Sequence, residues 1–350
     1  MNTYNLKNII MVMYLLVPLL FYGVPYLYFF HQGGMNLNFF GSQFIESSNV
    51  LQMLIGHLFI GVLVCIFLLN RSFMLSVKEE KTVLNDVLLV FSFGLTYFIP
   101  FGIVSMISYP WFLFLFVSRR HYVISMILLL IISIFLVFFH EVRYPFVQVV
   151  ILLLLPLLSR LSVFRLLMLA ITALLFMAFI LQPLRSGMIP FVETSDELVY
   201  LFQHLQPIYL GANTSLNINL DFSRMLAESI PFLKSALGYD SVINLISREG
   251  LSIEAYANGT RYGSNSSMYF NNVGYVIVIS FFLVFNLLMR FINSRSLDSV
   301  VLIYLTVYGV YFIRRSFGSY FIDLFVVIFI SFVYLFLKYF FGSKRIMQSC

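Results

Sequence analysis

The chain has 350 residues, of which 61% are hydrophobic and only 10% are charged, and its mean hydropathy is +0.96. A soluble domain carries about 25% charged residues, so this composition excludes a soluble domain with one anchor and favours a polytopic membrane protein. The formal net charge of +6 does not require a nucleic-acid partner, because cytoplasmic Lys and Arg residues orient membrane helices. The two cysteines, Cys65 and Cys350, are not expected to form a disulfide.

Apolar segments long enough to cross a bilayer follow one another along the first half of the chain. Lys7 precedes the first of them, and no small-residue cleavage site follows, so we expect an uncleaved span and not a signal peptide. Residues 87–118 are too long for one pass, and we expect a tight hairpin of two spans that turns near Pro100. The other expected spans in this half are 9–30, 50–70, 121–140, 144–159 and 166–183.

Residues 184–271 form the only long polar interval, and three more spans are expected after it, at 272–290, 300–313 and 320–341. The expected fold class is therefore an all-α polytopic membrane protein with about ten transmembrane helices and one large loop. We expect residues 1–183 to hold transmembrane helices 1–7 and the loop 184–271 to hold short amphipathic helices. Residues 272–350 would hold transmembrane helices 8–10 and a cytoplasmic tail.

The basic residues set the expected orientation, with both termini in the cytoplasm and the large loop outside. In that arrangement thirteen of the 21 Lys and Arg residues lie on the cytoplasmic side. Those left outside are nearly all arginines, whose planar fork suits phosphate oxygens. They are Arg143, Arg185, Arg224, Lys234, Arg248, Arg261, Arg314 and Arg315.

Four of these arginines, at 143, 185, 314 and 315, lie where a span meets the outer interface, which is the depth of a lipid-linked phosphate. Their position on the outer side breaks the positive-inside rule. One explanation is that they bind phosphate. The other is that they snorkel to the interface and form ion pairs, for example Arg143 with Glu141.

Within the loop, apolar spacing predicts helices at 195–206, at 222–237 with a break at Pro231, and at 240–247. Such amphipathic pieces can lie on the outer leaflet and cover the spans. The intervals 211–220 and 257–274 are rich in Asn, Ser and Gly, which suit sugar hydroxyls and equally mark plain loops. The histidines show no zinc-ligand spacing, and the chain has no P-loop, dinucleotide fingerprint or nucleophile elbow.

Several short motifs accompany this layout. His140-Glu-Val-Arg143-Tyr ends an outer link, and Leu184-Arg-Ser-Gly187 opens the loop. Arg224-Met-Leu-Ala-Glu-Ser-Ile-Pro231 and an Arg-x10-Gly spacing from Arg248 follow, and Tyr269-Phe-Asn-Asn-Val-Gly274 leads into the next span. In layout and in these motifs the chain resembles the O-antigen polymerases (Wzy type), the oligosaccharide repeat-unit polymerase family. It departs from the family near Met268, where an acidic residue is common.

The resemblance implies a multi-pass glycosyltransferase of the bacterial inner membrane, with a GT-C-like fold and a periplasmic loop, that acts in lipopolysaccharide biosynthesis. Its substrates would be undecaprenyl-diphosphate-linked oligosaccharides, and it would transfer the growing chain onto a new repeat unit. No nucleotide sugar, metal or other cofactor is expected, since the leaving group is already a lipid diphosphate. Membrane lipids and a chain-length regulator protein are the other expected partners.

The chemistry of this transfer assigns candidate roles. Arginine donors would stabilise the charge that develops on the leaving diphosphate, and a carboxylate or histidine would take the proton of the acceptor hydroxyl. The structural reading of Glu197 as part of a helix N-terminal charge pair, and of His204 as a helix-face residue, stays open. The candidates for diphosphate binding are Arg143, Arg185, Arg248, Arg314 and Arg315. Those for the base or acceptor positioning are Glu197, Glu228, Glu254 and His204.

Three other functions remain open. An O-antigen ligase has the same layout and donor but transfers to lipid A-core. A flippase or other transporter of lipid-linked oligosaccharide would favour internal repeats, charges within spans and short loops, whereas no repeat is visible, charges within spans are few and the outer loop is large. A polysaccharide acyltransferase would need a cytoplasmic site, for which Arg119-Arg120-His121 is the available segment.

Overall fold

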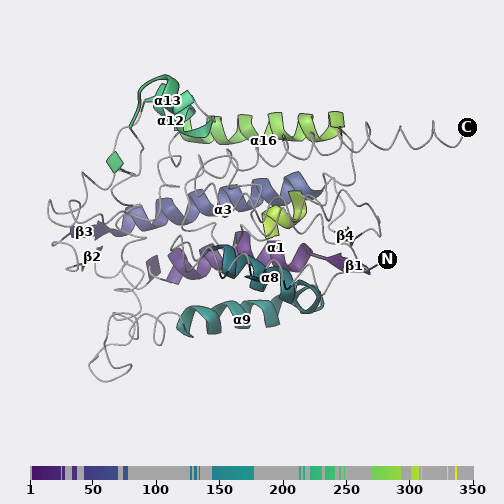
Figure 1. The fold of residues 1–350 in the computed structure, drawn as a ribbon. Helices are drawn as coiled ribbons and strands as arrows, with labels where there is room; N and C mark the ends of the chain where they lie inside the picture. Colours follow the sequence, from purple (N-terminus) through teal and green to yellow (C-terminus); the bar gives the residue numbers. More distant parts are fainter. Residues whose placement is uncertain are drawn as a thin grey trace, which may run out of the picture.

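The structure is a computed structural model, and most of the residues that it describes lie in helices. These helices run side by side in roughly one direction, with short strands at their ends (Figure 1). The described residues are 2–24, 26–27, 34–37, 43–69, 74–77, 127, 130–131, 134, 144–176, 213, 216, 221–230, 233–240, 244–245, 248, 270, 272–292, 301–306, 309, 329 and 336.

The first helical segment changes its winding along its length. It begins as the α-helix α1 (Lys7–Met11) and continues as two π-helical stretches, η1 (Val12–Leu16) and η2 (Leu19–Gly23). Pro18 lies between these stretches, and because proline has no backbone N–H it cannot donate the α-helical hydrogen bond. π-Helical turns are rare in proteins and, like proline, interrupt the regular α-helical ladder.

Helix α3 (Ser47–Leu69) has 23 residues and packs against η1, η2 and α16. Gly61 allows its close approach to η1, since a Cβ at this position would collide with the backbone carbonyl of Tyr14. Among the described residues, Ser47–Leu68 is the one helix whose length and apolar composition would let it cross a bilayer. Lys7–Gly23, Val149–Leu158, Val163–Ala173 and Val273–Leu288 are shorter apolar helices.

Two short antiparallel strand pairs lie outside the all-α expectation. Strand β1 (Asn2–Asn5) pairs with β4 (Met74–Val77), with Asn2 opposite Val77, and β2 (Gly34–Leu37) pairs with β3 (Gln43–Glu46), with Gly34 opposite Glu46. Strand β1 precedes the first expected span, and the other three strands lie in links between expected spans. Backbone N–H and C=O groups need partners there, and a two-stranded ladder supplies them.

Helices α8 (Tyr144–Leu158) and α9 (Val163–Phe176) form a hairpin. Its turn is closed by backbone hydrogen bonds from Arg160 N to Leu157 O and from Leu161 N to Leu158 O, both 3.1 Å long. The side-chain amide of Asn8 donates to the carbonyl of Leu161 over 3.1 Å and so attaches the turn to α1. Helix α9 also contacts α1 and η1.

The second half of the chain contributes two short helices, α12 (Phe222–Ser229) and α13 (Leu233–Ala236), and the long helix α16 (Asn272–Ile292). Helix α12 contacts both α13 and α16. Residues 301–306 are helical and buried, and the hydroxyl of Tyr14 donates to the carbonyl of Leu305 over 2.8 Å. The amino-terminal helix and the carboxyl-terminal part of the chain therefore share one core.

Helices α3, α8, α9 and α16 lie where spans are expected at 50–70, 144–159, 166–183 and 272–290. Helices α12 and α13 lie within the expected loop helix at 222–237, and α12 ends at Ser229, just before Pro231 in the sequence. The expected hairpin at 87–118 and the expected loop helix at 195–206 lie outside the described residues.

Candidate functional site

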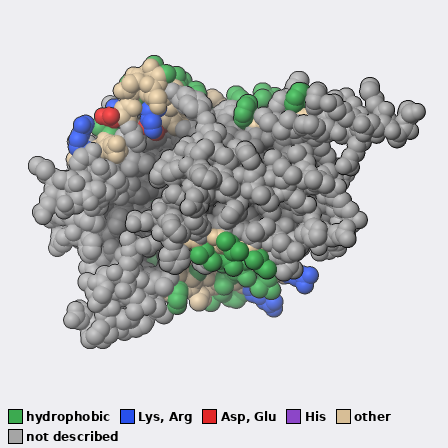
Figure 2. All heavy atoms as spheres, in the orientation of Figure 1, with side chains coloured by type: hydrophobic (Ala, Val, Ile, Leu, Met, Phe, Trp, Pro, Cys, Tyr) green, Lys and Arg blue, Asp and Glu red, His purple; other side chains and the backbone are tan. Residues whose placement is uncertain are grey.

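Charged and polar residues of the described chain gather near α12 and α13, at one end of the helices. The β2–β3 pair and the first turns of α3 lie toward this end, whereas β1, β4 and the last turn of α16 lie toward the other (Figure 1). Figure 2 shows acidic and basic side chains together over α12 and α13, and a separate group of basic side chains beside an apolar patch. Within the described part of the large loop, the α12–α13 segment therefore carries the cluster of charged side chains.

Asp221 starts α12 as its N-terminal cap. Its backbone is extended, and its carboxylate accepts hydrogen bonds from the Arg224 backbone N–H over 3.1 Å and from the Ser223 hydroxyl over 2.7 Å. The Ser223 hydroxyl first, and then the Arg224 N–H, hold the pKa of Asp221 below its ordinary value of 3.8. Asp221 therefore stays ionised at the helix end where a negative charge is favourable.

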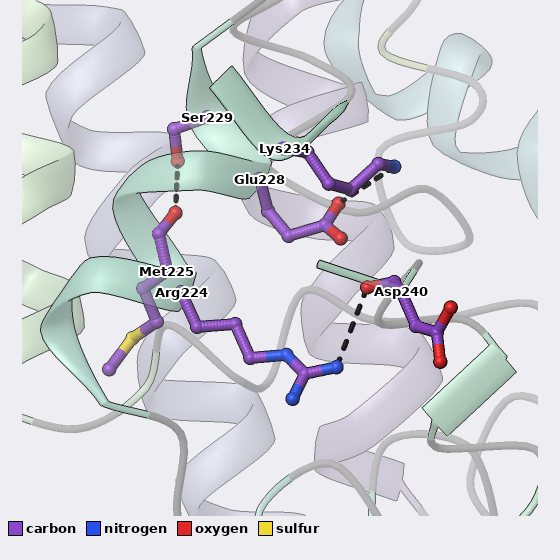
Figure 3. A network of polar contacts seen from close by, with 6 residues as sticks. All are labelled: Arg224, Met225, Glu228, Ser229, Lys234 and Asp240. Carbon is purple, nitrogen blue, oxygen red and sulfur yellow. Dashed lines mark hydrogen bonds and ion pairs between the residues drawn. The ribbon is translucent and has the colours of Figure 1, made fainter. Parts of the chain in front are cut away.

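Arg224 reaches from α12 toward the segment that follows α13 (Figure 3). Its Nη2 donates to the carbonyl of Asp240 over 3.4 Å, and its guanidinium carbon lies 5.6 Å from the centre of the Tyr239 ring. The hydroxyls of Ser223 and Tyr239 are 3.1 Å apart and share a hydrogen bond. These contacts tie the two ends of the segment together.

Glu228 lies one turn beyond Arg224, on the side of α12 that faces Lys234 (Figure 3). Its Oε2 is 3.6 Å from the Lys234 Nζ, and the two side chains are 12% and 35% exposed, respectively. The neighbouring Ser229 hydroxyl is buried and donates to the carbonyl of Met225 over 2.9 Å. Glu228 is thus a nearly buried carboxylate that forms an ion pair with Lys234 of α13.

Gly238 ends α13 with a φ of 69°, in the left-handed region. The N–H of Gly238 bonds to the Ser235 carbonyl over 3.3 Å, and that of Tyr239 to the Lys234 carbonyl over 3.1 Å. This pair of bonds is a Schellman motif, for which glycine is the favoured residue. The reversal that it makes brings Tyr239 and Asp240 back to Arg224.

A second polar group lies at the same end, within the apolar helix α3. We define the α3 polar face as Asn49, Gln52, Gly56 and His57. Asn49 Nδ2 donates to the Oδ1 of Asn213 over 2.6 Å, and Gln52 Nε2 donates to the carbonyl of Phe270 over 2.6 Å. Both partners belong to the interval 184–271, so α3 holds the loop at two points.

His57 is fully buried in this face. Its Nδ1 is 2.8 Å from the carbonyl of Met53, and because a carbonyl only accepts, Nδ1 carries a proton. The imidazole stacks on Tyr22 with ring centres 4.7 Å apart and meets Phe270 edge-on at 4.9 Å. This ring sandwich connects η2, α3 and the residue that precedes α16.

The structure describes two of the nine residues assigned a role from the sequence. Glu228 forms the ion pair in α12, and Arg248 is an exposed residue in a helical position. The other seven lie outside the described residues, and they are Glu197, Glu254, His204, Arg143, Arg185, Arg314 and Arg315.

The α3 polar face was not assigned a role from the sequence. Asn49 was placed in the link before the second span, and His57 was considered only as a metal ligand. A signal was present, because Asn49, Gln52 and Gly56 follow a spacing of three and four residues that puts them on one side of a helix. Polar side chains within an apolar span are costly and therefore mark sites by default.

Within the described ranges, no group of three or more His, Cys, Asp and Glu residues has an arrangement that holds a metal ion. Those ranges offer instead a largely buried carboxylate, the half-buried basic groups of Arg224 and Lys234, and side-chain amides near one end of apolar helices. Comparison with protein-family models, with curated proteins and with solved structures found no match.

Proposed function

We propose that the chain polymerises undecaprenyl-diphosphate-linked O-antigen repeat units at the periplasmic face of the bacterial inner membrane. The reaction breaks the bond between the growing chain and its lipid diphosphate. It forms a glycosidic bond to a hydroxyl on the terminal sugar of a new lipid-linked unit. The acceptor loses its proton to a base, and undecaprenyl diphosphate leaves.

The observation that supports this proposal best is the separation of polar groups along the helices. The loop segment α12–α13 and the α3 polar face lie at one end, and the exposed residues Lys7, Arg160 and Arg165 belong to the other. Apolar side chains between these ends face outward, such as Val62 in α3 at 46% and Leu283 in α16 at 59% exposure. Exposed apolar surface of this extent suits a lipid surrounding.

The chemistry of the loop end also supports transfer from a lipid diphosphate. Glu228 is a carboxylate that lies at the same end of the helices as the loop, where it can accept a proton from a sugar hydroxyl. The arginines proposed for diphosphate binding at 143, 185, 314 and 315 follow or precede expected spans at that interface. Arginine keeps its charge when partly desolvated and binds phosphate through two parallel hydrogen bonds.

The proposal is tested by deleting the gene and complementing it, with lipopolysaccharide separated on a gel. Loss of polymerisation leaves a single repeat unit attached to lipid A-core, and the wild-type gene restores the ladder. Loss of all attached repeats, with long lipid-linked chains retained, would instead identify a ligase. Repeat units trapped on the cytoplasmic face would identify a flippase.

A further inference from the structure

The α3 polar face does more than fill space between helices. Asn49, Gln52 and Gly56 lie on one side of α3, and each meets a residue from the loop 184–271. An amide inside an apolar helix has few partners, so a hydrogen bond made there is retained. The two amide contacts therefore define where the loop lies against α3.

Gly56 makes the closest of these contacts. A Cβ built on Gly56 would overlap the ring of Phe270, which is 1% exposed. The ring therefore lies directly on the α3 backbone, and the carbonyl of the same residue accepts from Gln52. Only glycine at this position leaves room for Phe270.

Phe270 lies just before α16, and its contact with α3 is continuous with the interface between α3 and α16. Phe59 meets Tyr275 with ring centres 5.0 Å apart, and Phe67 meets Phe285 at 4.8 Å. Helix α12, which carries Glu228, contacts α16 as well. A shift of Phe270 on α3 would therefore reach the candidate carboxylate through α16 and α12.

We infer that the α3 polar face is a docking seat for the loop 184–271, which it holds at Asn213 and at Phe270, and that Gln52 and Gly56 are positioning residues for glycosyl transfer. The positioning role rests on the proposed function, whereas the docking seat rests only on the contacts between α3 and the loop. Misplacing a reacting group by about 1 Å can lower a rate about a hundredfold, so a seat of this kind affects turnover directly.

The seat is tested first without any activity measurement. Cysteines replace Asn49 and Asn213 in a full-length protein that carries Cys65→Ser and Cys350→Ser, and disulfide formation is followed in membranes. We expect ready crosslinking in this parent and about a tenfold lower rate after Gly56→Ala, since overpacking displaces Phe270. Failure of the parent to crosslink, or an unchanged rate after Gly56→Ala, would overturn the seat.

Gly23→Ala is the matched control, because among the described residues a Cβ at Gly23 meets Leu54 Cδ2 alone, at an ordinary 3.8 Å. We expect this variant to crosslink like the parent. A second test uses Phe270→Ala, which removes the ring atoms that a Cβ at position 56 would meet. When Phe270→Ala is combined with Gly56→Ala, the crosslinking rate should recover toward that of the parent. If the reductions in rate caused by the two substitutions simply add, direct contact is contradicted.

The positioning role is tested by turnover, with the native Asn49 and Asn213 present. In reconstituted protein, Gly56→Ala should lower kcat about a hundredfold per folded molecule, with KM for the lipid-linked unit little changed. A lower yield of folded protein with unchanged kcat would show a purely structural seat and overturn the positioning role. If the wild-type protein forms no polymer, the proposed function fails, whereas the crosslinking result still decides the seat.

Discussion

Glu228 is the candidate base whose surroundings are known at the residue scale. Its carboxylate is largely screened from water, and it forms an ion pair with Lys234, with Oε2 3.6 Å from Nζ. A proton acceptor in this setting is held in place by the helix and by its ion pair. The ion pair could also serve only to hold α12 and α13 together. Replacing Glu228 by a neutral residue distinguishes a catalytic base from such a structural ion pair.

If Glu228 is the base, Glu228→Gln removes the proton acceptor and should lower polymerisation about 100-fold or more. Lys234→Gln is the matched control. Because Lys234 is itself half-buried and its Nζ lies 3.6 Å from the carboxylate, water can take its place beside Glu228, and this variant should keep most of the activity. Polymer length and amount on a gel, normalised to membrane levels, report both variants. Equal and small effects in the two variants would reduce Glu228 to a structural tie.

Asp221 shows how little of a residue's role is visible in its type alone. The sequence marks it as one acid among several in the loop, whereas the structure shows a helix cap with two donors. Because its pKa in the folded chain is lowered, the cap stabilises α12 above the ordinary pKa of 3.8 and loses this contribution as the pH falls below it. It is therefore fully present at neutral pH.

At the scale of elements, the long apolar helices are the part of the fold that the sequence predicts well. Helix α3 begins and ends within a few residues of the expected span at 50–70, because an apolar run of that length has few other ways to satisfy its backbone. The strand pairs were not predicted. Strands β1 and β4 are four residues each and far apart in the chain, and such pairing leaves little pattern in the sequence.

The contacts of α3 with the loop were also beyond prediction, for a different reason. The spacing of Asn49, Gln52 and Gly56 is readable, but their partners depend on how the loop returns to the helix. That Phe270 lies on Gly56 follows from tertiary packing, not from a local rule. The π-helical stretches around Pro18 are an intermediate case, because proline predicts a disturbance without saying of which kind.

The end of α13 provides a test at the element scale. Gly238 has a positive φ, and a Cβ added there meets none of the described residues within 4 Å, so Gly238→Ala introduces backbone strain without a clash against them. We expect a destabilisation of the segment by about 1–2 kcal/mol. Faster hydrogen exchange in residues 233–240 of the full-length protein would report it. Gly238→Asn should have a smaller effect, and unchanged exchange in both variants would contradict the motif.

At the scale of the whole molecule, the proposal requires that the two ends of the helices face different compartments. Ser235 in α13 and Ser162 before α9 are both exposed and belong to opposite ends, which makes them a matched pair. Each is replaced by cysteine in the background with Cys65→Ser and Cys350→Ser. An impermeant maleimide added to cells with a permeable outer membrane should label Ser235→Cys, and should label Ser162→Cys only after lysis.

The reverse labelling pattern would place the loop in the cytoplasm, where a lipid-linked repeat unit is assembled and not polymerised. Labelling of both cysteines before lysis would show that the two ends are not separated by a membrane. Either result would remove the physical basis of the proposed reaction, because the arginines and Glu228 must share the compartment of the substrate.

The most direct test of polymerase activity is reconstitution of the purified chain in liposomes that contain undecaprenyl-diphosphate-linked repeat units and no nucleotide sugar. We predict lipid-linked chains of increasing length, with one undecaprenyl diphosphate released for each new linkage, and a marked loss of product with Arg185→Ala. A wild-type chain that leaves the repeat units unextended under these conditions would contradict the proposed function.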